Sequence, residues 1–223
     1  MYNRYKAVVL ATLLAGLLPV SLPLLAELFI SEALLQKIEK QFDSEARQRV
    51  ENWQTLMQEG RQLTELEKLT LVNDFFNSNV LFVDDILLWN KEDYWATPIE
   101  MLSIGAGDCE DYSIAKYFTL KQLGVDEDKL RITYVKAINL DQAHMVLTYF
   151  ETKRSIPLVL DNLIDEIKPA TRRQDLIPVY SFNGTGLWLA KSRGEGQRVG
   201  DASRLSLWED LAARMRAETI DNR

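Results

Sequence analysis

Residues 105–124 have the sequence GAGDCEDYSIAKYFTLKQLG and contain the only cysteine of the chain, Cys109. After Asp108 the apolar residues recur at helical spacing until Gly124, a residue type that favours the position just beyond a helix C-terminus. Asp108 is suited to the N-cap, with Asp111 at the third helical position. The pattern predicts a helix whose first residue is Cys109, where the helix dipole and free backbone N–H groups favour the nucleophilic thiolate.

The chain after this helix is predicted to form antiparallel strands. Segments rich in β-branched and aromatic residues, separated by polar or proline-containing turns, occur at 130–137, 143–150, 157–161, 176–182 and 186–190. A helix is expected at about 204–217, close to the end of the chain.

The chain before Cys109 is predicted to be mainly helical. Apolar residues spaced by three and four predict a helix over 28–59, ended by Gly60, and the T-x-x-E pattern at 64–67 predicts the start of a second. The aromatic-rich stretch 77–98 is expected to be irregular. Helices followed by antiparallel strands indicate an α+β fold, and the absence of a repeat or a Gly/Ser linker favours one domain over 27–223.

Residues 1–26 have the pattern of an export signal. Arg4 and Lys6 precede an uncharged stretch of 20 residues, AVVLATLLAGLLPVSLPLLA, which ends at Ala26. A basic start followed by an apolar segment is typical of a signal peptide, and 20 apolar residues also suffice for a membrane anchor. Both interpretations place the rest of the chain outside the cytoplasm.

Composition excludes several functional classes. The 223-residue chain has 26 Lys+Arg against 33 Asp+Glu and a net charge of −7, which argues against nucleic-acid binding. One cysteine cannot form an intrachain disulfide, and one cysteine with one histidine is too few for a Cys/His zinc site.

Cys109, His144 and Asp161 form a candidate catalytic set. His144 lies at the start of one predicted strand and Asp161 at the end of another, so a sheet could place the imidazole between the carboxylate and the thiol. A lone cysteine is more often an inert core residue and a lone histidine more often structural. From spacing alone, both interpretations remain open.

Three acids surround the cysteine: Asp108, Glu110 and Asp111. Acids in a first helical turn stabilise the helix dipole, but carboxylates beside a thiol raise its pKa and oppose nucleophilic catalysis. A divalent cation bound to them would reverse this effect, and flexible oxygen ligands favour Ca²⁺ over Mg²⁺. Asn139 and Asp141 are weaker candidates for additional ligands.

Two features near the cysteine have a structural and a functional interpretation. Gly105 and Gly107 allow close approach of a substrate and, with the Cys109 N–H, could contribute to an oxyanion site. Trp95 is expected mainly to pack in the core, the alternative being that its indole N–H lines the site.

Three segments together resemble a known family: YWATPIEMLSIGAGDCEDYSIAKYFTLKQLG at 94–124, AHMVLTYF at 143–150 and VLDNL at 159–163. The chain resembles the bacterial transglutaminase-like cysteine proteinases over about 82–190, and among them the LapG-type periplasmic proteases that release adhesins. The resemblance implies a papain/transglutaminase-like core in which a cysteine-bearing helix packs on an antiparallel sheet. It also implies that Cys109 is the nucleophile, His144 the general base and acid, and Asp161 the residue that orients His144.

The resemblance further implies a function. Calcium would be bound by Asp108, Glu110 and Asp111, and the enzyme would be a periplasmic endopeptidase that cuts the N-terminal region of a large cell-surface adhesin near small residues such as Ala-Ala, promoting biofilm dispersal. The periplasmic domain of an inner-membrane cyclic di-GMP receptor would be its inhibitor. Two alternatives stay open: a transglutaminase or other acyltransferase using the same triad, and a non-catalytic binding module on this scaffold.

Overall fold

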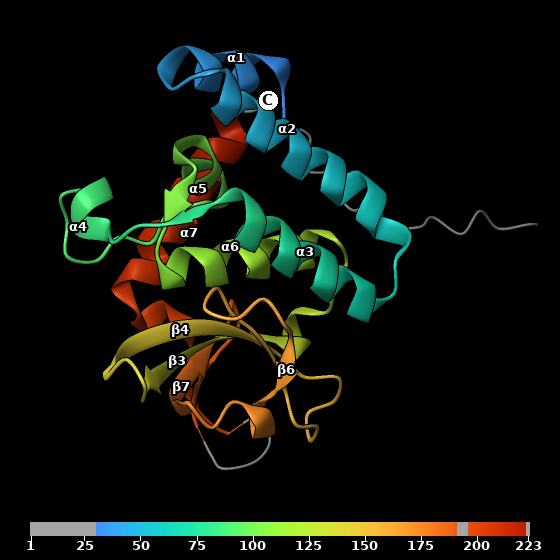
Figure 1. Ribbon diagram of the computed structural model, residues 1–223, viewed down its shortest axis with the longest axis vertical. Coiled ribbons are helices and arrows are strands. Elements are labelled where there is room, and N and C mark those ends of the chain that lie inside the picture. The colour runs from blue at the N-terminus through green and yellow to red at the C-terminus, as the bar shows by residue number, and fades with distance from the viewer. Residues whose placement is uncertain (1–29, 191–195, 222–223) are drawn as a thin grey trace, which may run out of the picture.

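The structure is a computed structural model that describes residues 30–190 and 196–221 (Figure 1). In these ranges the helices are α1 Glu32–Gln41, α2 Ser44–Glu59, α3 Glu65–Asn79, α4 Asp85–Leu88, α5 Pro98–Ile104, α6 Cys109–Gln122 and α7 Ser206–Asp221. The strands are β1 Leu81–Phe82, β2 Ala106–Gly107, β3 Leu130–Ala137, β4 Gln142–Tyr149, β5 Leu158–Leu160, β6 Lys168–Pro169, β7 Leu176–Phe182, β8 Leu187–Leu189 and β9 Gln197–Gly200. The predicted α+β class is confirmed.

Within the described residues the main sheet has seven strands in the order β6-β5-β4-β3-β7-β8-β9, and each neighbouring pair is antiparallel. In the β3–β4 hairpin, Val135 is paired with His144. A second, two-stranded sheet joins β1 to β2 in parallel, directly before α6. Figure 1 shows most helices gathered on one side of the main sheet.

Helix α6 is the centre of the core. It contacts both β4 and α3, so it is covered by the sheet and by another helix. Its residues Ile114, Ala115 and Leu120 are fully buried in one cluster with Ile132 and Leu147 of the sheet. Burying a side chain of the size of Ile114 or Leu120 stabilises a fold by about 1.5–3 kcal/mol, so α6 is held firmly against the sheet.

The strands predicted over 130–137 and 176–182 are confirmed at the same residues, as β3 and β7, and those over 143–150, 157–161 and 186–190 correspond closely to β4, β5 and β8. β6 and β9 were not predicted, since each is short and lacks an apolar alternation. The C-terminal helix is confirmed as α7.

Two predictions for the N-terminal half were wrong. The single helix expected over 28–59 is divided into α1 and α2, because the Asp43 side chain accepts a hydrogen bond from the Ala46 N–H at 2.6 Å and starts a new helix. The stretch 77–98, expected to be irregular, contains the end of α3, β1, α4 and the first residue of α5.

The predicted export segment, 1–26, lies outside the described residues, as do positions 28 and 29 of the first expected helix. Among the helices within 30–190 and 196–221, none has the length and apolar character needed to cross a bilayer.

Candidate active site

Cys109 is the first residue of α6, as predicted, and Asp108 is the N-cap. Its side chain is partly buried, and its thiol donates a hydrogen bond to Oε2 of Glu110 at 3.0 Å. The backbone N–H of Met145, the residue after His144, acts on the thiol by favouring its ionised form. Burial and then the Glu110 carboxylate raise the pKa of Cys109 far above its usual value, whereas the Met145 N–H lowers it.

His144 and Asp161 are in direct contact. Nε2 of His144 lies 2.8 Å from Oδ1 of Asp161, and both side chains are almost fully buried. Burial alone would raise the pKa of Asp161, but the hydrogen bond and charge of His144, with smaller contributions from Leu163 and Arg173, lower it to about 2. The carboxylate is therefore ionised beside the imidazole at neutral pH.

A second buried charge holds Asp161 from the other side. Nη2 of Arg173 lies 2.7 Å from Oδ2 of Asp161 and 2.8 Å from Oδ2 of Asp175. The Leu163 N–H donates to Oδ1 of Asp161 at 3.1 Å. Arg173 was missed in the sequence, where it stands in an ordinary polar stretch.

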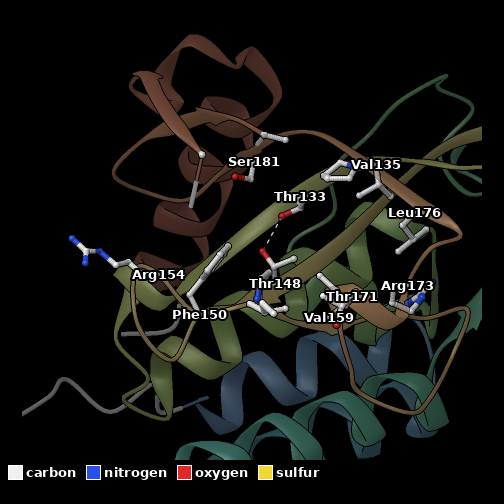
Figure 2. Close-up of a pocket in the computed structure, with 16 residues that line it drawn as sticks. Thr133, Val135, Thr148, Phe150, Arg154, Val159, Thr171, Arg173, Leu176 and Ser181 are labelled. Carbon is white, nitrogen blue, oxygen red and sulfur yellow. Dashed lines mark hydrogen bonds between the residues drawn. The ribbon is translucent and has the colours of Figure 1, made fainter. Parts of the chain in front are cut away.

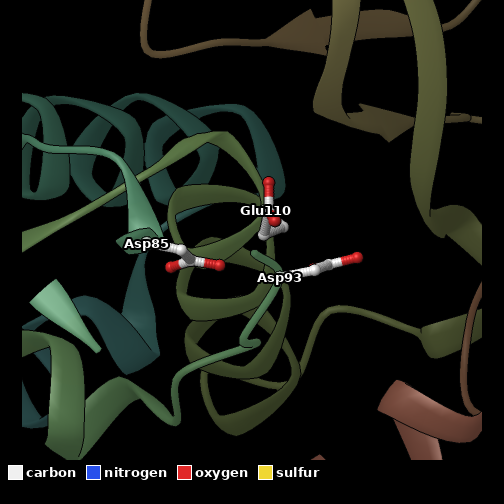
Figure 3. A group of neighbouring side chains, drawn as sticks. All are labelled: Asp85, Asp93 and Glu110. Atoms are coloured by element: carbon white, nitrogen blue, oxygen red, sulfur yellow. The ribbon is translucent and has the colours of Figure 1, made fainter. Parts of the chain in front are cut away.

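The three predicted acids, Asp108, Glu110 and Asp111, are joined by two residues that sequence reasoning missed. Asp85, Asp108 and Asp111 offer carboxylate oxygens within 4.8 Å of one another, and so do Asp85, Asp93 and Glu110. Figure 3 shows Asp85, at the start of α4, and Asp93, from the following segment, near Glu110 on α6. The signal for both was present as acids in an aromatic-rich segment, but that segment was taken as irregular.

This acid cluster fits a hard divalent cation. Oδ1 of Asp85 and Oδ1 of Asp108 are buried and have no hydrogen-bond partner among the described residues. Burial and neighbouring carboxylates raise the pKa of Asp108 to about 9, and burial raises the pKa of Asp111 well above its ordinary value and that of Glu110 to about 7. Crowded carboxylates with unpartnered oxygens are the donor set that Ca²⁺ and Mg²⁺ bind. Asp141, a weaker candidate, instead pairs with Lys136 at 2.7 Å.

The glycines before Cys109 have structural roles. Gly105 has φ of 76° and ends α5, a conformation that favours glycine. A Cβ on Gly107 would meet the Asp111 carboxylate at 2.7 Å. That carboxylate accepts hydrogen bonds from the N–H groups of Ala96 at 2.7 Å and Asp108 at 3.3 Å. The glycines thus allow the acid cluster to pack against the chain that leads to the nucleophile.

Trp95 lies in the core, in agreement with the expected packing role. Its ring stacks on Phe182 with centroids 5.4 Å apart, and its side chain is 4% exposed.

A cavity of about 650 Å³ lies beside the His144–Asp161 pair, because Arg173, which pairs with Asp161, is one of its lining residues (Figure 2). Its lining residues Thr133, Val135 and Thr148 alternate along β3 and β4 with Ile132 and Leu147, which belong to the core around α6. The cavity therefore opens on the other face of the sheet. Cys109, His144 and Asp161 do not line it.

Comparison with known proteins agrees with this geometry. The family model of the bacterial transglutaminase-like cysteine proteinases matches residues 36–189, whereas no curated protein sequence matches the chain. The structure of EGTA-treated LapG from Legionella pneumophila is 42% identical, with a TM-score of 0.73, and the match covers 84% of this chain and 98% of that chain. Calcium-bound LapG from the same organism is also 42% identical, with a TM-score of 0.71 over 83% of this chain and 99% of that one.

The family match spans more than half of the chain, and the similarity to LapG extends over nearly the whole of the solved chains. The helix and antiparallel sheet described above match LapG and form a transglutaminase-like fold. This chain belongs to the bacterial transglutaminase-like cysteine proteinases and is a cysteine protease.

Proposed function

We propose that this protein is a calcium-dependent endopeptidase in which Cys109 is the nucleophile, His144 the general base and acid, and Asp161 the residue that orients His144. The observation that carries the proposal is the buried 2.8 Å contact between His144 Nε2 and Asp161 Oδ1. The residue after His144, Met145, has a backbone N–H that lowers the pKa of the Cys109 thiol. Because Nε2 faces Asp161, Nδ1 is the ring nitrogen left to exchange a proton with the thiol.

The reaction follows from this assignment. Transfer of the thiol proton to Nδ1 of His144 gives a thiolate–imidazolium pair, and the sulfur of Cys109 then attacks the peptide carbonyl carbon. The tetrahedral intermediate collapses as His144 gives its proton to the leaving amine, which leaves an acyl group on Cys109. His144 then takes a proton from water, the hydroxide attacks the thioester, and the carboxylic acid product departs. Asp161 stays ionised throughout and stabilises the charged imidazole.

The oxyanion of the intermediate needs hydrogen-bond donors. The backbone N–H of Cys109 belongs to the first residue of α6, and the first N–H groups of a helix have no partner within it. We assign this N–H as one donor, because it lies at the positive end of the helix beside the reacting sulfur.

Calcium would be bound by Asp85, Asp108 and Asp111, with Glu110 and Asp93 completing the ligand set. When bound, the ion supplies positive charge against the carboxylates that otherwise disfavour the thiolate. Glu110 connects the two sites directly, because its carboxylate accepts the Cys109 thiol hydrogen bond. Support for calcium over magnesium comes from the similarity to LapG, which has been solved with calcium bound.

The same likeness suggests the biological setting. We infer that the substrate is the N-terminal region of a large cell-surface adhesin, cut near a pair of small residues, so that cleavage releases the adhesin and promotes biofilm dispersal. The apolar segment 7–26 would export the chain to the periplasm, as a cleaved signal or a retained anchor. There the periplasmic domain of an inner-membrane cyclic di-GMP receptor would sequester the protease.

One experiment tests the core of this proposal. The purified protein is incubated with the N-terminal adhesin fragment from the same cells, in calcium, in magnesium, or with a calcium chelator. Cleavage is expected with calcium only, and Cys109→Ala protein should not cleave. Adding a primary amine distinguishes the acyltransferase alternative: an amide product in place of the acid would reassign the chain to acyl transfer.

A further inference from the structure

The short strand β1 is hydrogen-bonded to the segment that leads into the nucleophile. Leu81 N–H donates to the Gly105 carbonyl at 3.0 Å, and Val83 N–H donates to the Gly107 carbonyl at 3.1 Å. Gly107 is two residues before Cys109. Among the residues within 30–190 and 196–221, this small sheet contains β1 and β2 alone, so the outer edge of β1 carries no third strand.

The backbone of Phe82 is directed to that outer edge. In a parallel ladder, alternate residues direct their N–H and C=O groups to the same neighbour. Because Leu81 and Val83 bond to β2, Phe82 between them directs its N–H and C=O away from β2. An added strand would find one donor and one acceptor there.

The side chains along this edge are apolar and exposed. Leu81 is 72% exposed and Phe82 50% exposed on β1, and Ile86 and Leu87 on α4 are 53% and 76% exposed. Folded proteins usually protect a free strand edge with charges, proline or a covering element, or by keeping the strand very short. β1 has only two residues, but both are apolar and exposed. Here an unpaired edge and exposed large apolar residues occur in one segment, 81–87, and its strand pairs with the chain that ends two residues before Cys109. An unpaired edge with apolar side chains is the combination that binds extended peptides.

We propose that the outer edge of β1, with Leu81, Phe82, Ile86 and Leu87, is a docking surface for an extended segment of the protein substrate, which adds to β1 as a third strand. The proposal rests on the proteolytic function proposed above. We take the substrate as the occupant because β1 pairs with β2, which continues directly into Cys109, so a peptide bound at the nucleophile has residues within reach of this edge.

The spacing of strands indicates how far from the scissile bond the docked segment of the substrate would lie. Neighbouring strands lie about 4.8 Å apart, so the added strand would lie about 10 Å from β2. Extended chain advances about 3.3 Å per residue, so the docked segment would be about three to five residues from the scissile bond. Short peptides around the cut site would therefore miss the edge, and longer ones would reach it.

The test measures peptide binding to protein carrying Cys109→Ala, in calcium, so that cleavage does not interfere. Two peptides serve as probes. The long peptide has about twelve residues, with a central Ala-Ala pair flanked by alternating valine and threonine. The short peptide contains only the central part of the long one. The long peptide should bind about tenfold more tightly than the short one, the gain expected from burying about one apolar side chain. Adding Leu81→Ser and Phe82→Ser should reduce the ratio of the two affinities, long peptide over short, to about one.

A second variant probes the backbone. Phe82→Pro removes the outward N–H but leaves the Leu81 and Val83 donors that hold β1 to β2. It should also reduce the ratio, with an unchanged melting temperature showing that the fold is intact. Leu66→Ser is the matched control, because Leu66 is 61% exposed on α3 and should leave the ratio unchanged.

The docking proposal would be overturned if the affinity ratio were the same with the unaltered edge and with the Leu81→Ser, Phe82→Ser variant. It would also be overturned if the protein with the unaltered edge bound the two peptides with equal affinity. Failure of the proposed function appears differently, as a lack of cleavage by the chain that retains Cys109.

Discussion

The side-chain nitrogen of Lys116 lies 3.1 Å from the backbone carbonyl oxygen of Asp161. Lys116 is on α6, the helix that starts with Cys109, and is 1% exposed. The same nitrogen contacts the amide oxygens of Asn73 at 2.8 Å and Asn77 at 2.7 Å, and the Asn77 amide also donates to the Asp161 carbonyl at 2.8 Å. A polar network thus joins the helix that carries the candidate nucleophile to the residue that contacts His144.

Lys116→Met should reduce both stability and turnover. The substitution keeps the apolar volume but leaves buried oxygens of Asn73 and Asn77 without their donor, at a cost of about 1–3 kcal/mol. Because Asp161 would lose one of its two backbone anchors, kcat should fall more than KM rises. Urea denaturation and steady-state kinetics measure the two effects. Unchanged kcat with reduced stability would limit Lys116 to a structural role.

Cys109→Ala should abolish cleavage, and His144→Ala should be similarly inactive. Members of a catalytic triad act as a unit, so each loss is expected to be about 10³-fold or more. Circular dichroism should be unchanged for Cys109→Ala, since the side chain is partly exposed at a helix start. Residual cleavage by the purified Cys109→Ala protein would rule out covalent catalysis by this thiol.

Asp161→Asn should retain some activity and change the acid stability of the protein. The pKa of Asp161 is about 2 in the folded protein, below its ordinary value of 3.8, so the ionised form is favoured by folding. Its contribution to the free energy of unfolding is complete above the ordinary value and is lost as the pH falls toward 2. Wild type and variant should therefore differ in stability at pH 6 and converge at low pH, about 2. A difference that persists unchanged in acid would contradict this reasoning.

Asp85→Asn should weaken the response to calcium. Binding to the folded state stabilises it by about 2.7 kcal/mol when the calcium concentration is about 100 times the Kd, so the melting temperature of the wild type should rise with calcium. The variant loses one charge from the acid cluster but keeps an oxygen that can accept from the Tyr94 N–H. Asp84→Asn, at the exposed neighbouring position, is the matched control. If calcium stabilises neither the wild type nor the control, the metal assignment fails.

Replacing Leu13, Leu14, Leu17 and Leu18 with charged residues should keep the chain at full length in the cytoplasm. These residues lie in the uncharged segment 7–26, whose apolar character is the expected export signal. Cell fractionation measures the outcome, with the unaltered chain as the control. Recovery of the charged variant from the periplasm would refute the export interpretation.

Much of the fold could be read from local sequence. The start of α6 at Cys109 and the strands β3, β4, β5, β7 and β8 follow from short-range periodicity and capping, which depend on neighbouring residues. The division of the first predicted helix at Asp43 was also encoded locally, but the continuous apolar spacing concealed it. β6 and β9 have no local signal, because pairing with a neighbouring strand is what makes them extended.

The sequence by itself determined the chemical inventory of the site: one thiol at a helix start, one imidazole, a strand-end carboxylate and three flanking acids. Only the tertiary structure decided that Asp85 and Asp93 join those acids. It also decided that Arg173 and Lys116 contact Asp161, and that β1 pairs with the segment directly before Cys109. These partners are brought together by packing between distant segments. A single sequence reports such contacts poorly, because the residues that form them have no fixed spacing along the chain.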